Sequence, residues 1–159
     1  MWSTEEIFKG IVRDGSPYAR KYFQVRRTRR KKILNRIFSI MTRLPSAIPK
    51  ISGYQFRENR LELKIKYIEG GSPTRVSNEH MRNILAQWKK EGFVHGDLSP
   101  SNLIYDGKEL WCIDWLVDLD TYRGTPRYAS HEVFRGKHTH TSDEYAFCKM
   151  VGEFSKRVR

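Results

Sequence analysis

The sequence has very little cysteine and no long apolar run. Only Cys112 and Cys148 occur among its 159 residues, far apart and outside any C-x-x-C or metal-ligand spacing. This usage argues against a disulfide framework and favours a reducing compartment, so we expect a cytoplasmic protein. No window approaches the roughly 20 apolar residues of a membrane-spanning helix. The acidic N-terminus is not typical of a secretory signal, so we expect any membrane contact to be peripheral.

Acidic residues are also scarce. There are 30 Lys and Arg against 18 Asp and Glu, which gives a net charge of +12, and no acidic residue occurs between Gln24 and Arg57. Such a surface attracts phosphates, nucleic acid, anionic lipid or an acidic protein. The charge indicates a class of partner and leaves the chemistry open.

Length and hydrophobic pattern predict one unit or two small lobes, with strands preceding helices. At 18.9 kDa with 38% hydrophobic residues, the chain has enough apolar material for a core. Apolar periodicity and turn residues predict the order of the elements. We expect a hairpin over 7–12 and 18–23, a basic helix over 24–44, a second hairpin over 49–56 and 60–68, a helix over 76–91, short strands over 93–94, 103–105 and 110–113, and a final helix.

One constellation of polar residues suggests chemistry. Asp97 and Asn102 lie in the loop of residues 94–102, and Asp114 follows a short hairpin whose turn we expect at Asp106-Gly107. Mg²⁺ prefers oxygen ligands, and phosphoryl transfer needs such ions to neutralise charge on the transferring group. We therefore expect Asn102 and Asp114 on a metal and Asp97 as the base that orients an acceptor hydroxyl.

The same residues form motifs that resemble the protein-kinase-like superfamily. H-G-D-L-S-P-S-N at 95–102, D-W-L at 114–116 and G-T-P-R-Y-A-S-H-E-V at 124–133 resemble its catalytic loop, metal-binding motif and activation-segment end. With H-G-D in place of H-R-D, the chain resembles small bacterial effector kinases, RIO-like kinases and lipopolysaccharide-core kinases, which also carry H-G-D.

That resemblance implies a reduced, bilobal α+β fold in one domain over residues 1–159. We expect a small β-rich N-lobe with one helix over about 1–69, a hinge near 66–73 and a truncated, mainly helical C-lobe from about 74. It implies a phosphotransferase that uses ATP with Mg²⁺ or Mn²⁺, and an acceptor that is a protein Ser/Thr or a carbohydrate or lipid hydroxyl. Switching by loop phosphorylation is not expected, because H-G-D lacks the arginine that would receive the phosphate.

The resemblance also assigns individual residues. Tyr18-Ala19-Arg20-Lys21 resembles V-A-I-K, which implies that Lys21 steadies the nucleotide phosphates. Asp97 and Asn102 would be catalytic, and Asp143 falls where the family's aspartate braces the catalytic loop. Residues expected to line the nucleotide site are Ala19, Tyr67, Ile68 and Ile113.

Several departures from the family pattern favour a rival hypothesis. The basic helix offers no glutamate to pair with Lys21, and only Ser3–Phe8 stands where half of the glycine-rich loop would lie. Ser99 replaces a lysine, and Leu116 replaces the glycine of D-F-G. The alternative is a pseudokinase-like binding module that uses its basic helix as the working surface.

The basic helix from Arg26 to Arg43 has two interpretations. It is either a solvated face or the docking surface for an anionic partner, such as a membrane leaflet, a phosphorylated glycolipid or an acidic protein. Nucleic acid is the least expected partner, because aromatic residues do not interleave with the charges of this helix. We expect no metal role for His138 and His140, which we place in an exposed loop, and we expect Cys112 to be a buried, inert thiol.

Overall fold

The computed structural model describes residues 12–13, 17–73 and 78–157. The chain divides into two units, residues 1–44 with 49–68 and residues 45–48 with 69–159. Among the described residues, no helix has both the length and the apolarity needed to cross a lipid bilayer.

The first unit is built on a four-stranded antiparallel sheet with the order β1-β2-β4-β3. Its strands are β1 (Val12–Arg13), β2 (Tyr18–Gln24), β3 (Ile51–Arg57) and β4 (Arg60–Lys66). The expected second hairpin is confirmed as β3 and β4, while residues 7–11 of the first expected strand lie outside the described residues. The sequence did not predict that β2 pairs with β4, which makes these two the inner strands.

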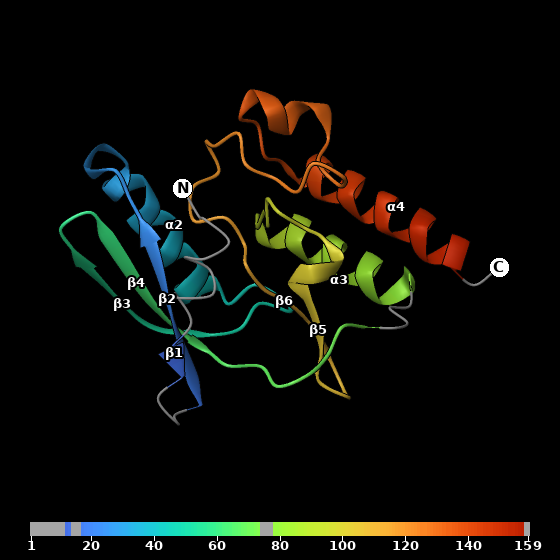
Figure 1. Cartoon of the computed structure of the whole chain (residues 1–159), viewed down its shortest axis with the longest axis horizontal. Coiled ribbons are helices and arrows are strands. Elements are labelled where there is room, and N and C mark those ends of the chain that lie inside the picture. Colours follow the sequence, from blue (N-terminus) through green and yellow to red (C-terminus); the bar gives the residue numbers. More distant parts are fainter. Residues whose placement is uncertain (1–11, 14–16, 74–77, 158–159) are drawn as a thin grey trace. The chain divides into compact units, whose positions relative to one another are not determined.

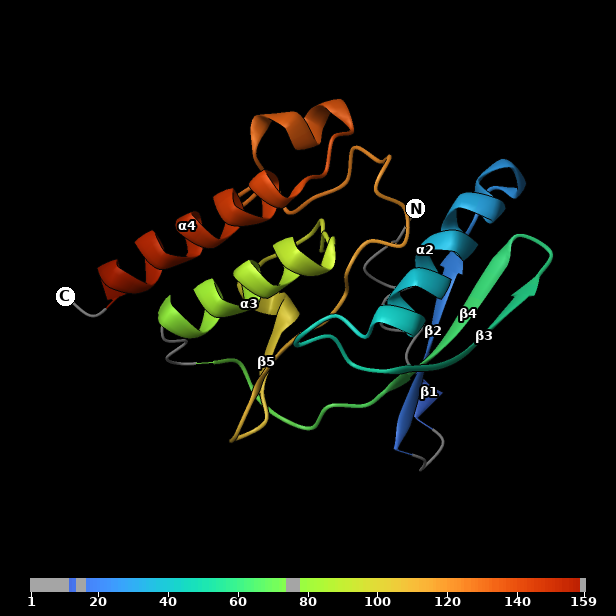
Figure 2. The same cartoon turned by 180° about the vertical axis from the view of Figure 1, so that it is seen from behind.

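One helix covers one face of this sheet. Helix α2 (Arg30–Arg43) follows a short 3₁₀ turn, η1 (Arg27–Arg29), and ends at Leu44 in the left-handed conformation. Its buried residues Ile33, Ile37 and Ile40 recur at helical spacing and face the sheet, along which the helix lies in Figures 1 and 2. The predicted helix therefore exists but begins after residue 24, because β2 extends to Gln24.

Strand register separates the residues of the sheet into two faces. Ala19, Lys21 and Phe23 are opposite Ile65, Leu63 and Leu61, so all six share the face that α2 covers. Leu61 and Leu63 are fully buried there. Alternate residues of β2 and β4, including both tyrosines of β2, point to the other face.

The second unit packs two long helices against each other, α3 (Asn78–Glu91) and α4 (His140–Arg157), which lie side by side in Figures 1 and 2. A small hairpin of β5 (Leu103–Tyr105) and β6 (Leu110–Cys112) carries the site loop, with η2 (Pro100–Asn102) before it and η3 (His131–Arg135) after it. The buried side chains of the two helices form the core, namely Met81, Ile84, Leu85 and Trp88 from α3 and Ala146, Phe147 and Met150 from α4.

Two local predictions in this unit are wrong. Phe93-Val94 is not a strand, because Phe93 instead donates its N–H to the Trp88 carbonyl at 2.9 Å and packs edge-on against the Trp88 ring. The turn after β5 is not a two-residue turn, because Tyr105 pairs with Leu110 and the connection holds four residues. The Asp106 carboxylate caps that connection by accepting the N–H groups of its third and fourth residues.

Residues 45–48, which follow α2, are bound within the second unit. The Trp88 indole donates to the Ser46 carbonyl at 2.7 Å, and the Glu91 carboxylate accepts the Ser46 N–H and hydroxyl at 3.0 and 2.7 Å. The Cys112 N–H donates to the Ala47 carbonyl at 2.8 Å. This short segment therefore belongs to the helical unit although the chain on both sides of it belongs to the sheet.

Candidate functional site

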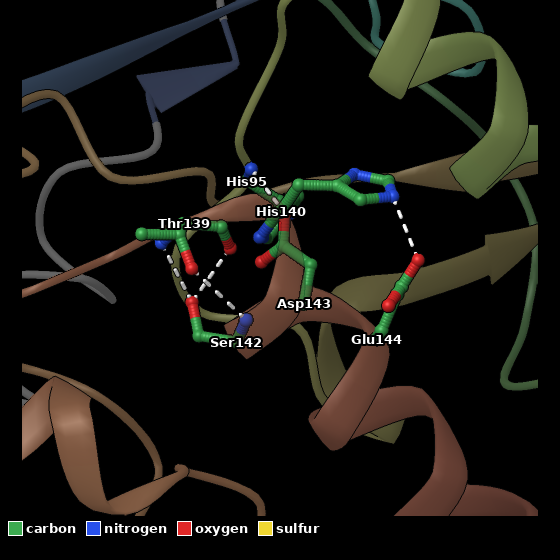
Figure 3. Close-up of polar contacts among 6 residues, drawn as sticks. All are labelled: His95, Thr139, His140, Ser142, Asp143 and Glu144. Carbon is green, nitrogen blue, oxygen red and sulfur yellow. Dashed lines mark hydrogen bonds and ion pairs between the residues drawn. The ribbon is translucent and has the colours of Figure 1, made fainter.

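The loop that carries the candidate site is held by one buried carboxylate. Asp143 is 2% exposed and accepts the backbone N–H groups of His95 and Gly96 at 2.7 and 3.0 Å. Figure 3 shows the Asp143 side chain beside the His95 backbone. A charged acceptor strengthens both hydrogen bonds. The bracing role that the resemblance implied for Asp143 is confirmed in its geometry.

Asp143 is placed by the start of α4. Thr139 precedes the helix and forms a capping box with Ser142, in which each residue's N–H donates to the other's hydroxyl oxygen, at 2.8 and 3.3 Å. The His140 ring contacts Glu144 one turn further on at 2.9 Å. The first turn of α4, which holds Asp143, is therefore fixed by its own local hydrogen bonds.

His95 links three parts of the second unit. Its ring stacks on Trp88 of α3, with 5.8 Å between centroids, and its Nε2 lies 2.8 Å from the Ile113 carbonyl. Its Nδ1 lies 3.2 Å from the Asp97 N–H, which can only donate, so the neutral ring must carry its hydrogen on Nε2. This tautomer connects the site loop to the residue before Asp114.

The glycine of H-G-D has a steric cause. Gly96 has a φ of 91°, a left-handed conformation that side chains rarely adopt, and a Cβ added there would lie 2.8 Å from Leu116. Leu116 in turn donates its N–H to the His95 carbonyl at 2.9 Å. The two departures from H-R-D and D-F-G are thus complementary, because Leu116 fills the space that Gly96 leaves.

Asp97 is held from two directions. Its Oδ1 accepts the N–H of Thr125 at 3.0 Å and the Thr125 hydroxyl at 2.8 Å. The Asn102 amide nitrogen donates to the Asp97 carbonyl at 2.7 Å and lies 3.5 Å from Oδ2. The carboxylate is therefore oriented before any ligand binds, with Oδ1 used by the protein and Oδ2 more available.

The donor set suits a metal that is completed by phosphate. The Asp97 carbonyl can only accept, so the Asn102 nitrogen must face it, which leaves the Asn102 amide oxygen for a cation. Ile113 donates its N–H to the Asn102 carbonyl at 2.8 Å, and Asp114 follows with a positive φ of 57°. Within the described part of the chain no cluster of three or more His, Cys, Asp or Glu could hold a metal alone. One or two carboxylates with substrate phosphates are the usual Mg²⁺ arrangement, and this donor set fits it.

A small cavity lies beside Asp97. Its volume is about 10 Å³, and Asp97, Thr125, Tyr128, Val133 and Asp143 are among the residues that line it. That volume holds about one water molecule.

The structure brings some expected site residues together and leaves others in the first unit. Hydrogen bonds in the second unit join Asn102 to Asp97 and to Ile113, and Asp114 follows Ile113 in the chain. The expected nucleotide residues of the first unit are Lys21, Ala19, Tyr67 and Ile68. Ala19 and Ile68 are buried, and Tyr67 is 36% exposed.

Lys21 is chemically unusual among the residues of the first unit. It lies on the sheet face that α2 covers, opposite the buried Leu63. Desolvation there lowers the pKa of Lys21 from 10.5 to about 8. Lysines whose pKa is lowered by desolvation are frequent at functional sites.

Two further expectations concern cysteine and histidine. The expected burial of Cys112 is confirmed, because the residue is fully buried. Desolvation, and secondly the Asp143 carboxylate, raise the pKa of its thiol, which favours an inert role. The expectation that His138 sits in an exposed loop is wrong. His138 is 8% exposed, and its Nε2 lies 2.8 Å from the carbonyl of Thr121, which is 17 residues away and has no local signal in the sequence.

Sequence reasoning missed the structural partners of the site. Thr125 is part of the G-T-P motif, but its contact with Asp97, 28 residues away, has no local signal. The link from His95 to Ile113 likewise depends on the fold. Only the spacing of the motifs pointed to these regions.

The α+β fold, with its small antiparallel sheet and one helix followed by a helical unit, is consistent with a reduced kinase-like fold. Residues 55–123 match the family model of the RIO domain, an atypical kinase-like family, and this stretch contains Asp97, Asn102 and Asp114. The match supports the resemblance to kinase-like proteins. It does not support the narrower resemblance to bacterial effector kinases or lipopolysaccharide-core kinases. No curated protein matches the chain.

Proposed function

We propose that this chain is an atypical minimal kinase that uses ATP with Mg²⁺ or Mn²⁺ and transfers the γ-phosphoryl group to a hydroxyl. The observation that carries the proposal is the position of Asp97. Its carboxylate is held by Thr125 and its backbone by Asn102, in the same unit as Asp114. An aspartate fixed in this way is prepared to orient an acceptor and to receive its proton.

In this mechanism Asp97 Oδ1 stays bound to Thr125 while Oδ2 accepts the hydrogen of the acceptor hydroxyl. The acceptor oxygen bonds to the γ-phosphorus, the bond from that phosphorus to the β-bridging oxygen breaks, and the hydroxyl proton passes to Asp97. Asn102 and Asp114 would hold the metal, which when bound neutralises charge on the phosphates. Lys21 would contact the phosphates, and Ala19, Tyr67, Ile68 and Ile113 would line the nucleotide site.

The acceptor is either a protein serine or threonine or a carbohydrate or lipid hydroxyl. The cavity beside Asp97 does not choose between them, because it holds about one water.

The test separates nucleotide binding from turnover. ATP with Mg²⁺ should raise the midpoint of thermal unfolding of the wild type, because a ligand of the folded state stabilises it. Asp114→Ala should abolish the metal-dependent part of this shift, whereas Asp97→Asn should keep the shift and lose phosphate transfer or ATP hydrolysis. ATP binding by Asp114→Ala equal to wild type would refute the metal assignment. A wild type that binds ATP but never turns it over would favour a scaffold.

A second candidate, a binding module that acts through α2, has its own supporting observation. Neither η1 nor the first turn of α2 contains an acidic residue or a side-chain cap, although the positive end of the helix dipole lies there. Phe38 on the same helix is 65% exposed. Basic residues placed against the dipole destabilise a helix, which favours a role in binding anions.

The reversal Lys31→Glu with Lys32→Glu tests that candidate. Both side chains are exposed, whereas Arg30 stacks on Phe56 and donates to the Glu58 carbonyl, so changing Arg30 would also disturb the fold. The reversal should abolish binding to phosphatidylserine vesicles at low salt. Equal binding by variant and wild type would leave α2 as a solvated face.

A further inference from the structure

The outer face of the sheet in the first unit is unusually basic. Strand register places Arg20 directly opposite Lys64, and Arg57 directly opposite Arg60. Like charges that face each other across strands destabilise a sheet. Glu62, whose carboxylate lies 3.7 Å from the Arg20 guanidinium, is the only acidic residue on this face of β2 and β4.

Protection of a sheet edge does not explain these cations. Lysines on edge strands are a common device against aggregation. Here Arg20, Arg60 and Lys64 lie on β2 and β4, the two inner strands of the order β1-β2-β4-β3. The pair of Arg20 and Lys64 therefore lies on the two inner strands, whereas the pair of Arg57 and Arg60 includes the edge strand β3.

Two tyrosines interleave with the cations on this face. The Arg60 guanidinium lies 4.0 Å from the centroid of the Tyr22 ring, and the Lys64 ammonium lies 5.3 Å from that of Tyr18. In both pairs the cation comes from the neighbouring strand and is diagonal to the ring. The tyrosines are four residues apart along β2, which corresponds to about 13 Å.

The face is open to solvent within this unit. The helix α2 lies on the opposite side of the sheet (Figure 1). Arg57, Arg60 and Lys66 are exposed, and Tyr18 and Tyr22 are partly exposed. The result is an exposed face of an antiparallel sheet on which rings and cations alternate.

We propose that this face, defined by Tyr18, Arg20, Tyr22, Arg60, Lys64 and Lys66, binds single-stranded nucleic acid. Aromatic rings on an antiparallel sheet stack on unpaired bases, and the surrounding cations bind the phosphates. The sequence made nucleic acid the least expected partner because α2 lacks interleaved aromatics. The sheet supplies them, and only strand register shows it. This inference does not depend on phosphotransfer.

Fluorescence anisotropy with a labelled oligouridylate of about 12 nucleotides tests the proposal. The wild type should bind it in a salt-dependent manner and should bind a duplex of equal length more weakly. Tyr18→Leu with Tyr22→Leu should weaken binding roughly tenfold per ring, with the salt slope unchanged. Tyr22→Phe keeps the ring and should bind nearly as well as wild type. Tyr122→Leu, a change at an exposed tyrosine of the other unit, is the matched aromatic control.

Two charge variants distinguish binding at this face from non-specific attraction of nucleic acid to the positively charged protein. Arg60→Gln with Lys64→Gln should lower the salt slope by about 1.4, the value for two lost contacts to a single strand. Lys31→Gln with Lys32→Gln removes the same charge from α2 and should leave the slope unchanged.

Four results would each overturn the proposal. They are no binding by the wild type, equal binding of duplex, equal effects of the two charge pairs, and full binding by the double leucine variant. If phosphatidylserine vesicles displaced the oligouridylate from the wild type, and if vesicle binding required Tyr18 and Tyr22, the face would be a membrane-binding surface instead. Metal-dependent ATP binding should be intact in all sheet variants, so a failure here is distinct from a failure of the proposed kinase.

Discussion

Lys21 and Asp143 are charged side chains in the interiors of the two units, and the protein treats them in opposite ways. Asp143 accepts two backbone N–H groups at 2.7 and 3.0 Å, so its burial is compensated by hydrogen bonds to the charged form. Lys21 lies opposite Leu63, and desolvation lowers its pKa to about 8. Hydrogen bonds therefore favour the charged form of Asp143, whereas desolvation disfavours the charged form of Lys21.

This difference distinguishes a structural charge from a functional one. The Asp143 carboxylate already accepts two backbone N–H groups, whereas an ammonium whose pKa is lowered by desolvation is frequent at functional sites. We therefore expect substitutions at the two positions to change stability in opposite directions.

The largest expected effect is at Asp143. Asp143→Ala leaves the His95 and Gly96 N–H groups buried without their acceptor and should lower the free energy of unfolding by about 3 to 5 kcal/mol. Asp143→Asn keeps one acceptor oxygen and should lose about half as much. Urea denaturation measures both. An Asp143→Ala midpoint equal to that of wild type would contradict the structural role.

Lys21 should give the opposite sign. Lys21→Met removes a charge whose pKa falls from 10.5 to about 8 and should raise the free energy of unfolding at pH 7 by roughly 2 to 3 kcal/mol, with loss of ATP binding. Lys31→Met, at an exposed position of α2, should change stability by less than about 0.5 kcal/mol. A destabilised Lys21→Met would show that the lysine serves the fold.

The pH dependence of the unfolding free energy tests whether the charge of Lys21 causes its effect on stability. The folded-state pKa of Lys21 is lower than its unfolded value, so between pH 8 and 10.5 the unfolded chain binds more protons and stability rises with pH. The difference in unfolding free energy between wild type and Lys21→Met should have its maximum value below pH 8 and should vanish near pH 10.5. A difference that stays constant over this range would mean that the charge is not its cause.

The smallest effect is expected at the start of α4. Thr139→Ala removes one half of the capping box with Ser142 and should cost about 1 kcal/mol in urea denaturation. Thr141→Ala, at an exposed position in the same turn, is the control. If the two variants were equally stable, Asp143 would not depend on the cap for its placement.

The sequence was sufficient for the elements and for the residues of the site loop. Periodicity predicted α2, α3 and the β3–β4 hairpin, and motif order predicted the loop with Asp97 and Asn102, because these signals are local. Phe93-Val94 failed because a short apolar run does not show whether a partner strand exists.

What the sequence could not supply was long-range pairing. The contact between Thr125 and Asp97 joins residues 28 positions apart, and the sheet face of Tyr18 and Tyr22 depends on β2 pairing with β4. The structural role of Gly96 becomes clear only when Leu116 is seen beside it.

The binding of residues 45–48 within the helical unit bears on how this protein can be cut and recombined. A clone that started at residue 69 would lack Ser46 and Ala47, which accept hydrogen bonds from Trp88 and Cys112. A fragment that begins at residue 69 should therefore be less stable than one that also contains residues 45–48. The two halves are interleaved in the chain, so we expect evolution to have inherited and exchanged them as one module.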